Sequence, residues 1–210
     1  MTASHVTAPT QIVEADGIRF AYRKFGKTTG TPLVLMQHFR GGMDHWDPAV
    51  TDGLAANRPV ILFNNAGVAS SSGQTPDTID AMAQHAADFI RALGLDKIDL
   101  LGFSLGGYVA QSLVIRYPEI VRRLLLVGTG PRGGEPPNDP QVPIHAASTD
   151  PRTGESPIEA FLYLFFSPSR RSQEAGKAFW QRRHLRAKDV DPPSSEQTMS
   201  AQFAAVKDCR

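Results

Sequence analysis

The stretch from Leu95 to Tyr108 constrains the fold of this chain more than any other. It places a short apolar run, a tight turn and a helix-like segment in that order, and the turn reads Gly102-Phe103-Ser104-Leu105-Gly106. The two glycines let the backbone turn sharply at the end of a strand, which lifts the serine between them above the carboxyl edge of a sheet. The pattern therefore predicts a strand–turn–helix unit that presents a serine hydroxyl.

Other apolar runs repeat this arrangement along the first 130 residues. Four short, mostly apolar runs are typical of strands covered on both faces of a parallel sheet. They are Leu33–Met36, Val60–Phe63, Ile98–Leu101 and Leu124–Val127. Residues 18–25 instead mix apolar and polar positions, which favours an antiparallel edge strand with one solvated face.

Helices are expected between these runs. Asp47 and Pro48 form a cap and first-turn pair for residues 48–56, and Thr78 and Gly94 bound an amphipathic helix. Residues 108–117 form a further helix that ends before a proline. Strands that alternate with helices imply crossover connections, so we predict an α/β fold with a mostly parallel sheet flanked by helices.

The second part of the chain has a different character. Residues 130–157 are rich in proline and glycine without a clear period, which indicates a long connector. Residues 158–166, 170–186 and 195–206 look helical, and no further strand is evident. We therefore expect residues 1–130 to form the N-terminal part of a core, and residues 131–210 to form a connector and a helical cap or lid.

Composition limits the partners of such a chain. Its 210 residues, 41% of them hydrophobic, suit one domain with a single core. The net charge of +1 gives no strong field that would favour nucleic acid or an anionic membrane. Residues 1–14 contain no basic leader, no run is long enough to span a membrane, and Cys209 has no partner for a disulfide or a metal. We expect a cytoplasmic protein with a small-molecule substrate and no metal or cofactor.

The chemistry of Ser104 requires further groups. A serine hydroxyl is a poor nucleophile until a base takes its proton. His38-Phe39-Arg40-Gly41-Gly42 follows the first parallel-type strand, and such a loop can aim a backbone N–H at a developing oxyanion, together with the N–H of Leu105. Phe39 would contribute its backbone amide, and His38 would orient the loop. The competing interpretation is a pair of ordinary glycine-rich turns, in which Ser104 only caps a helix.

These motifs resemble those of the α/β-hydrolase family, in the branch with a serine nucleophile. The resemblance covers roughly residues 12–130, through the segments 33–42, 46–48, 60–73 and 100–107. It implies ester, thioester or related acyl chemistry through an acyl-enzyme, and it disfavours the branches with an aspartate nucleophile. Relatives often carry Asp and Arg after the second parallel strand. This chain has Asn64 to Ser70 there, so the ion pair that usually braces the loop is not expected.

The resemblance also implies a triad acid and a histidine on loops after later strands, and the sequence shows neither. His145 and His184 are the only histidines after Ser104, and neither follows a strand-like run. Asp139 and Asp150 are interpreted as turn residues of the connector. We leave the triad acid and base unassigned and expect the chain to stop before the closing strands. The last apolar run would then be an uncovered sheet edge, which favours self-association.

Two groups of cap residues have competing interpretations. The basic residues are interpreted as a solvated helix face rather than a nucleic-acid site. They are Arg170, Arg171, Lys177, Arg182, Arg183, Arg186 and Lys188. The large apolar residues can line an acyl pocket or simply pack the cap onto the core. They are Phe161, Tyr163, Leu164, Phe165, Phe166, Phe179 and Trp180.

The leading hypothesis is a serine-dependent hydrolase of a small carboxylic ester or acyl compound, impaired by the missing acid and base. One alternative is a catalytically incomplete fragment that acts as a binding or assembly partner. Another is a cofactor-free perhydrolase, a haloperoxidase-like enzyme or a carbon–carbon bond hydrolase on the same scaffold.

Overall fold

The computed structural model describes residues 3–134, 139–150 and 153–208. Over these residues six strands form one sheet with the order β1-β2-β4-β3-β5-β6. The strands are β1 (Gln11–Ala15), β2 (Ile18–Gly26), β3 (Leu33–Met36), β4 (Pro59–Phe63), β5 (Ile98–Phe103) and β6 (Val121–Val127). The strands β3 to β6 are parallel, whereas β1 and β2 are antiparallel to each other and β2 is antiparallel to β4. The α/β prediction is confirmed.

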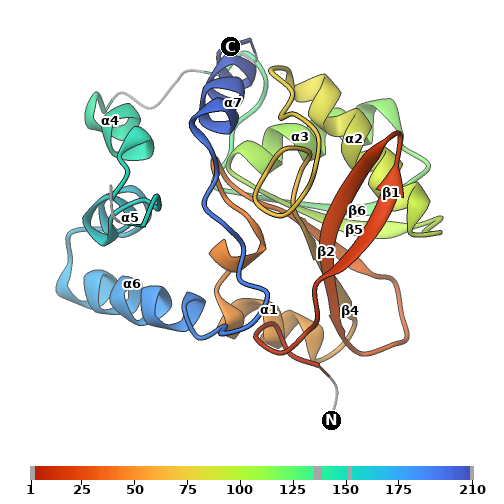
Figure 1. The fold of residues 1–210 in the computed structure, drawn as a ribbon, viewed down its shortest axis with the longest axis horizontal. Coiled ribbons are helices and arrows are strands. Elements are labelled where there is room, and N and C mark those ends of the chain that lie inside the picture. The colour runs from red at the N-terminus through yellow and green to blue at the C-terminus, as the bar shows by residue number, and fades with distance from the viewer. Residues whose placement is uncertain (1–2, 135–138, 151–152, 209–210) are drawn as a thin grey trace.

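Some helices cover the faces of the sheet, and others form a separate group beside it. They are α1 (Pro48–Ala55), α2 (Ile79–Ala92), α3 (Leu105–Arg116), α4 (Gln141–Ala147), α5 (Ile158–Phe165), α6 (Arg170–Arg183) and α7 (Glu196–Asp208), with a short 3-10 helix η1 (Met43–His45). Figure 1 shows α4, α5 and α6 grouped at one side of the molecule, and α7 between this group and α3. None of the helices in the described ranges is long and apolar enough to cross a membrane.

The core has two halves, one on each face of the sheet. Val34 and Met36 pack with α2 and α3, whereas Leu33 and Leu35 pack with α1 on the opposite face. All four side chains are at most 1% exposed. Because successive side chains of a strand point to opposite faces, β3 and β4, which are buried on both sides, have no polar position. This is the physical reason why these two runs were visible in the sequence.

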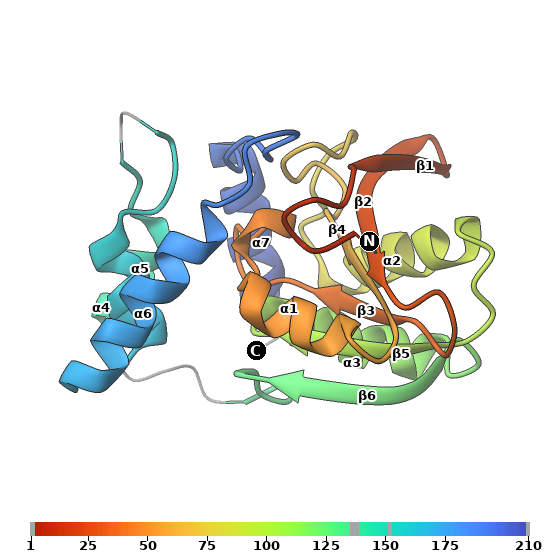
Figure 2. The ribbon, with the colours of Figure 1, turned by 90° about the horizontal axis from the view of Figure 1, so that it is seen from below.

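Strand β6 forms the outer edge of the sheet, as predicted. It pairs with β5 alone among the described residues, and Figure 2 shows it running along an open side of the molecule. Leu125, Leu126 and Val127 are 40%, 45% and 47% exposed. An apolar edge strand with unpaired backbone groups is a template for pairing with another strand.

The prediction that residues 18–25 form an edge strand is wrong. Strand β2 lies between β1 and β4, and β1 is the edge. The sequence did not predict strand β1, because Gln11–Ala15 is mostly exposed and lacks a clear apolar face. A signal was nevertheless present, since Asp16 and Gly17 have φ of +47° and +73° and form a two-residue hairpin turn.

One helix was not predicted, and another begins earlier than predicted. The connector, expected to have no periodic structure, contains α4, and α3 begins at Leu105 instead of residue 108. Helix α4 is short and contains Pro143, so its sequence carries no clear helical period. The caps agree with the sequence, because Asp47 accepts a hydrogen bond from Ala49 N and Thr78 accepts one from Ala81 N.

Helix α7 packs against the core. Ala205 is fully buried in the cluster formed with α2 and α3, and the Thr198 hydroxyl donates to the carbonyl of Gly67 at 2.8 Å. The division of the chain at residue 130 into core and cap stays a prediction, but the return segment clearly contacts the core. Cys209 lies outside the described residues.

The interpretation of the basic residues as a solvated face is wrong for two of them, Arg183 and Arg186. The side chain of Arg183 is only 5% exposed and contacts Glu155 at 3.3 Å. Arg182 donates to Asp47 at 2.6 Å, but its side chain is 38% exposed. Arg186 is buried because its guanidinium donates to backbone carbonyls of the N-terminal segment. These are the carbonyls of His5, Val6 and Ala8. A guanidinium with five donors can satisfy several carbonyls at once, so it can be buried without a full set of carboxylates.

Candidate active site

Ser104 occupies a strained backbone position at the junction of β5 and α3. Its φ and ψ are +53° and −118°, a combination that residues with a side chain rarely adopt. Such strain costs about 1–3 kcal/mol and persists only where neighbouring structure enforces it. Here Ser104 N donates to Val127 O at 2.9 Å, and Gly107 N donates to Ser104 O at 2.8 Å. The turn is therefore held between strand β6 and helix α3.

The glycines that flank Ser104 are required by close backbone contacts. A Cβ at Gly102 would lie 2.7 Å from the Gly107 Cα, and one at Gly106 would lie 2.3 Å from Met36 O. Helix α3 thus lies directly against the ends of β5 and β3. This contact places the Leu105 N–H next to the loop that follows β3.

The loop of residues 38–42 leaves one amide unoccupied close to Ser104. Within the described residues neither Phe39 N–H nor Leu105 N–H has a protein acceptor, whereas Gly41 N donates to His38 O and Arg40 N to Gln202 Oε1. Two unpaired N–H groups beside a serine are the arrangement that can hold an oxyanion.

The His38 ring is fixed to its own loop. Its Nδ1 lies 2.7 Å from Phe39 O, and its backbone N–H donates to Gln37 Oε1 at 2.8 Å. Burial lowers the pKa of His38 to about 4. The ring is therefore neutral near pH 7, and the loop-orienting role of His38 stays a prediction.

Arg40 joins this loop to the connector. Its guanidinium donates to two carbonyls at the C-terminal end of α4, those of Ala146 and Ser148, at 3.2 and 2.9 Å. It also reaches Thr149 Oγ1 at 3.1 Å and Gly154 O at 3.4 Å. The residue adjacent to the candidate oxyanion donor thus anchors a segment more than one hundred residues away in sequence.

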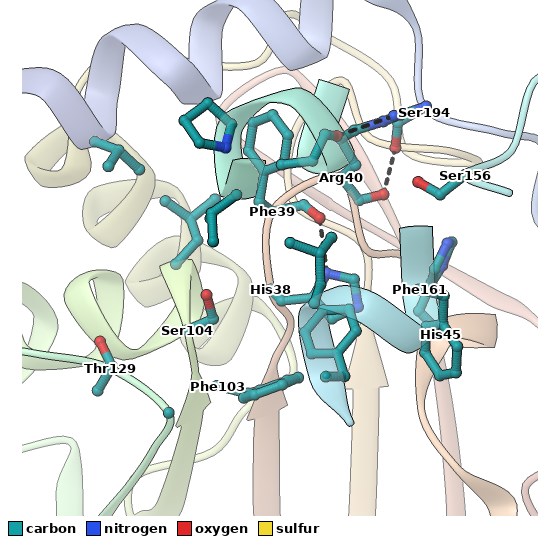
Figure 3. Close-up of a pocket in the computed structure, with 18 of the residues that line it drawn as sticks. His38, Phe39, Arg40, His45, Phe103, Ser104, Thr129, Ser156, Phe161 and Ser194 are labelled. Carbon is teal, nitrogen blue, oxygen red and sulfur yellow. Dashed lines mark hydrogen bonds between the residues drawn. The ribbon is translucent and has the colours of Figure 1, made fainter. Parts of the chain in front are cut away.

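Ser104 faces a cavity of about 1180 Å³ between the core and the cap. Figure 3 shows Ser104, His38, Phe103 and Thr129 around this space. Most of the wall is apolar or aromatic, and five of the seven apolar cap residues named from the sequence contribute to it. These are Phe161, Leu164, Phe165, Phe166 and Phe179. Tyr163 and Trp180 lie outside the wall; Trp180 packs on Phe161 with ring centroids 5.1 Å apart.

The residues considered as acid and base lie away from Ser104. His145 stacks on Tyr163, and His184 contacts Trp180 O and Glu155. Asp139 accepts hydrogen bonds from Tyr163 and from the start of α4. Within the described ranges no histidine or carboxylate makes a hydrogen bond to the Ser104 hydroxyl. Phe39, Ser104 and Leu105 thus line one cavity, and among the described residues no candidate base is hydrogen-bonded to the serine.

A buried carboxylate that the sequence did not reveal braces the loops around the site. Asp191 accepts hydrogen bonds from Met43 N at 3.0 Å, from Asn64 Nδ2 at 2.9 Å and from the Ser70 hydroxyl. Burial raises the pKa of Asp191. Asn64 and Ser70 belong to the segment in which the usual ion pair was not expected, and Asp191 holds this segment by hydrogen bonds.

Comparisons with known proteins agree with this geometry. A sequence profile described as the alpha/beta hydrolase fold matches residues 31–198, so the chain belongs to the α/β-hydrolase family. A solved structure of an alpha/beta hydrolase fold protein from Chitinophaga pinensis is 39% identical, with a TM-score of 0.87 over 99% of this chain and 74% of that one.

Relatives with curated names match a smaller part. The 1-acylglycerol-3-phosphate O-acyltransferase ABHD5 of Homo sapiens is 37% identical over 102 residues, which are 46% of this chain and 29% of that protein. The putative carbamate hydrolase RutD of Azorhizobium caulinodans is 34% identical over 99 residues, 47% of this chain and 37% of that protein. The match thus spans only about a third of these relatives.

Proposed function

We propose that this chain is a serine-dependent hydrolase of a small carboxylic ester or related acyl compound. The observation that carries the proposal is the strained Ser104, which faces an apolar cavity beside two N–H groups without acceptors. Relatives named as an O-acyltransferase and a putative carbamate hydrolase are consistent with chemistry at a carbonyl carbon.

In the proposed reaction Ser104 Oγ attacks the carbonyl carbon and loses its proton to a base. The C=O electron pair moves to the oxygen, which accepts hydrogen bonds from Phe39 N–H and Leu105 N–H. Collapse of this intermediate breaks the ester bond, and the alkoxide leaves as the alcohol after it takes up a proton. Water then attacks the acyl-enzyme, releases the acid and restores Ser104.

No residue in the described part of the chain is assigned as the base or the acid, so the proposed activity of the chain alone is low. In a serine protease stripped of its triad, the oxyanion hole and binding still give about 10³–10⁴-fold acceleration over water. Turnover that depends on Ser104 is expected to lie above this level and far below that of an enzyme with a complete triad.

Labelling with a fluorophosphonate probe, followed by intact mass, tests the proposal. The wild-type chain is expected to gain one adduct and Ser104→Ala none. Ser156→Ala is a matched control, because Ser156 lines the same cavity. Labelling that persists in Ser104→Ala would show that another residue is the nucleophile.

A second candidate function is that of a binding or assembly partner, which the exposed edge of β6 favours. Ester-hydrolysis assays separate the two. Turnover above background that disappears in Ser104→Ala supports the enzyme. Absence of turnover, together with concentration-dependent oligomers, supports the assembly role.

A further inference from the structure

Two histidines give the cavity polar groups that the proposed mechanism does not use. His38 and His45 both line it, and their rings lie 5.7 Å apart at an interplanar angle of 87°. The His38 ring also contacts Phe103 and Phe165 at centroid distances of 5.5 and 5.0 Å, and Arg40, Glu155 and Arg183 line the same cavity.

The hydrogen bonds of His38 determine which of its nitrogens carries the proton. Its Nδ1 lies 2.7 Å from Phe39 O, and a carbonyl oxygen can only accept. Nδ1 must therefore carry the hydrogen. In a neutral ring the other nitrogen, Nε2, is then a hydrogen-bond acceptor.

The hydrogen bonds of His45 require the opposite tautomer. Its Nδ1 lies 3.0 Å from Gly42 N, and a backbone N–H can only donate. Nδ1 must therefore be the acceptor, and Nε2 carries the hydrogen. Burial lowers the pKa of both histidines, so both rings are neutral near pH 7.

Neither Nε2 atom has a protein partner within the described residues, and neither is sealed from the cavity. A polar atom in an apolar environment is costly unless a hydrogen bond satisfies it. The cavity thus presents an acceptor on His38 and a donor on His45. Among common organic groups, a hydroxyl can donate to the first and accept from the second.

We infer that His38 and His45 bind a hydroxyl group of the substrate, so that the substrate class is a hydroxy-substituted ester or acyl compound. This inference rests on the proposed use of the cavity as the substrate site. A methoxy group could not donate to His38 Nε2, so it is expected to bind more weakly than a hydroxyl.

Ligand binding to Ser104→Ala tests the inference without depending on turnover. The probes are methyl esters of ω-hydroxy acids of increasing chain length, each with its methoxy and unsubstituted analogues. At one chain length the hydroxy ester is expected to bind on the order of tenfold more tightly than its analogues, as two neutral hydrogen bonds predict. In Ser104→Ala/His45→Phe this preference is expected to vanish, whereas in Ser104→Ala/His145→Phe it should remain. Equal binding of all analogues at every length would overturn the inference.

Nitrogen-15 NMR of the wild-type histidines gives a second test that needs no variant. The expected spectrum near pH 7 shows His38 protonated at Nδ1 and His45 protonated at Nε2, and the bound hydroxy ester shifts both Nε2 signals. A charged ring, a reversed tautomer or unchanged Nε2 signals would overturn the inference. Failure of fluorophosphonate labelling would instead count against Ser104 as nucleophile and would leave both of these results intact.

Discussion

Replacing Gly106 with alanine is expected to destabilise the protein strongly, because this glycine lets helix α3 lie against the end of β3. The added Cβ would lie 2.3 Å from Met36 O, 2.5 Å from Met36 C and 2.8 Å from Gln37 O. Ordinary contact begins at 3.4 Å, so the worst overlap is 3.4 − 2.3 = 1.1 Å. All three atoms belong to the backbone and cannot rotate away.

The size of the effect follows from what must move. Overpacking that side chains can absorb costs about 1–3 kcal/mol. Here helix α3 and strand β3 must separate, so we expect about 3 kcal/mol or more, out of the roughly 5–15 kcal/mol that stabilise a typical domain. The same separation would move the Leu105 N–H away from the loop of residues 38–42.

Urea unfolding followed by circular dichroism measures this cost. The matched control is Gly53→Ala in helix α1, where no atom lies within 4 Å of the added Cβ. Since alanine favours a helix over glycine by about 1 kcal/mol, the control should be more stable than the wild type. If Gly106→Ala unfolds at the wild-type urea concentration while the control behaves as expected, the close contact does not exist.

Three other perturbations follow from the structure. Leu126→Lys is expected to reduce self-association through β6, whereas Ile115→Lys on helix α3 should not; a monodisperse wild-type monomer in sedimentation velocity would contradict the idea. Burial lowers the pKa of His5 from 6.5 to about 4. As the pH falls, the unfolded state therefore takes up a proton before the folded state does, and the protein loses stability between these two pH values. The urea midpoints at pH 7 and pH 5 should differ less in His5→Phe than in the wild type. Arg23→Met leaves the buried carboxylate of Asp44 without its guanidinium partner and should lower the free energy of unfolding by about 3–5 kcal/mol. Asp44→Asn in the same chain should restore part of this loss, and strictly additive losses in a double-mutant cycle would argue against coupling of the two residues.

The sequence predicted the elements whose pattern is local. The strand–turn–helix unit at Ser104 and the strands β3 and β4 carry their signals within a few residues, because burial of these two strands on both faces leaves no polar position. Strands β5 and β6 were found from apolar runs that make up only part of each strand. The same reasoning failed for β1, whose exposed residues lack such a pattern and whose only signal is the turn at Asp16 and Gly17.

The groups that shape the cavity from a distance could not be predicted. Asp191 contacts Asn64 across 127 residues, and Arg182 contacts Asp47 across 135. A carboxylate or guanidinium in a polar segment looks solvated until its partner is known, so composition alone assigns it to the surface. The roles of the two nitrogens in His38 and His45 likewise depend on backbone groups that only the folded loop brings into position.

The candidate oxyanion loop is held from two sides, and this explains why half of the site was visible in the sequence and half was not. On one side the contact of Gly106 with Met36 fixes the loop against the nucleophile, entirely within the first 107 residues. On the other side Arg40 N donates to Gln202 on helix α7, and its guanidinium anchors the connector. A movement of the connector or of α7 would therefore displace Arg40, which is next to Phe39. The position of the Phe39 N–H, and with it any stabilisation of an oxyanion, depends on the packing of the second half of the chain as much as on the motif around Ser104.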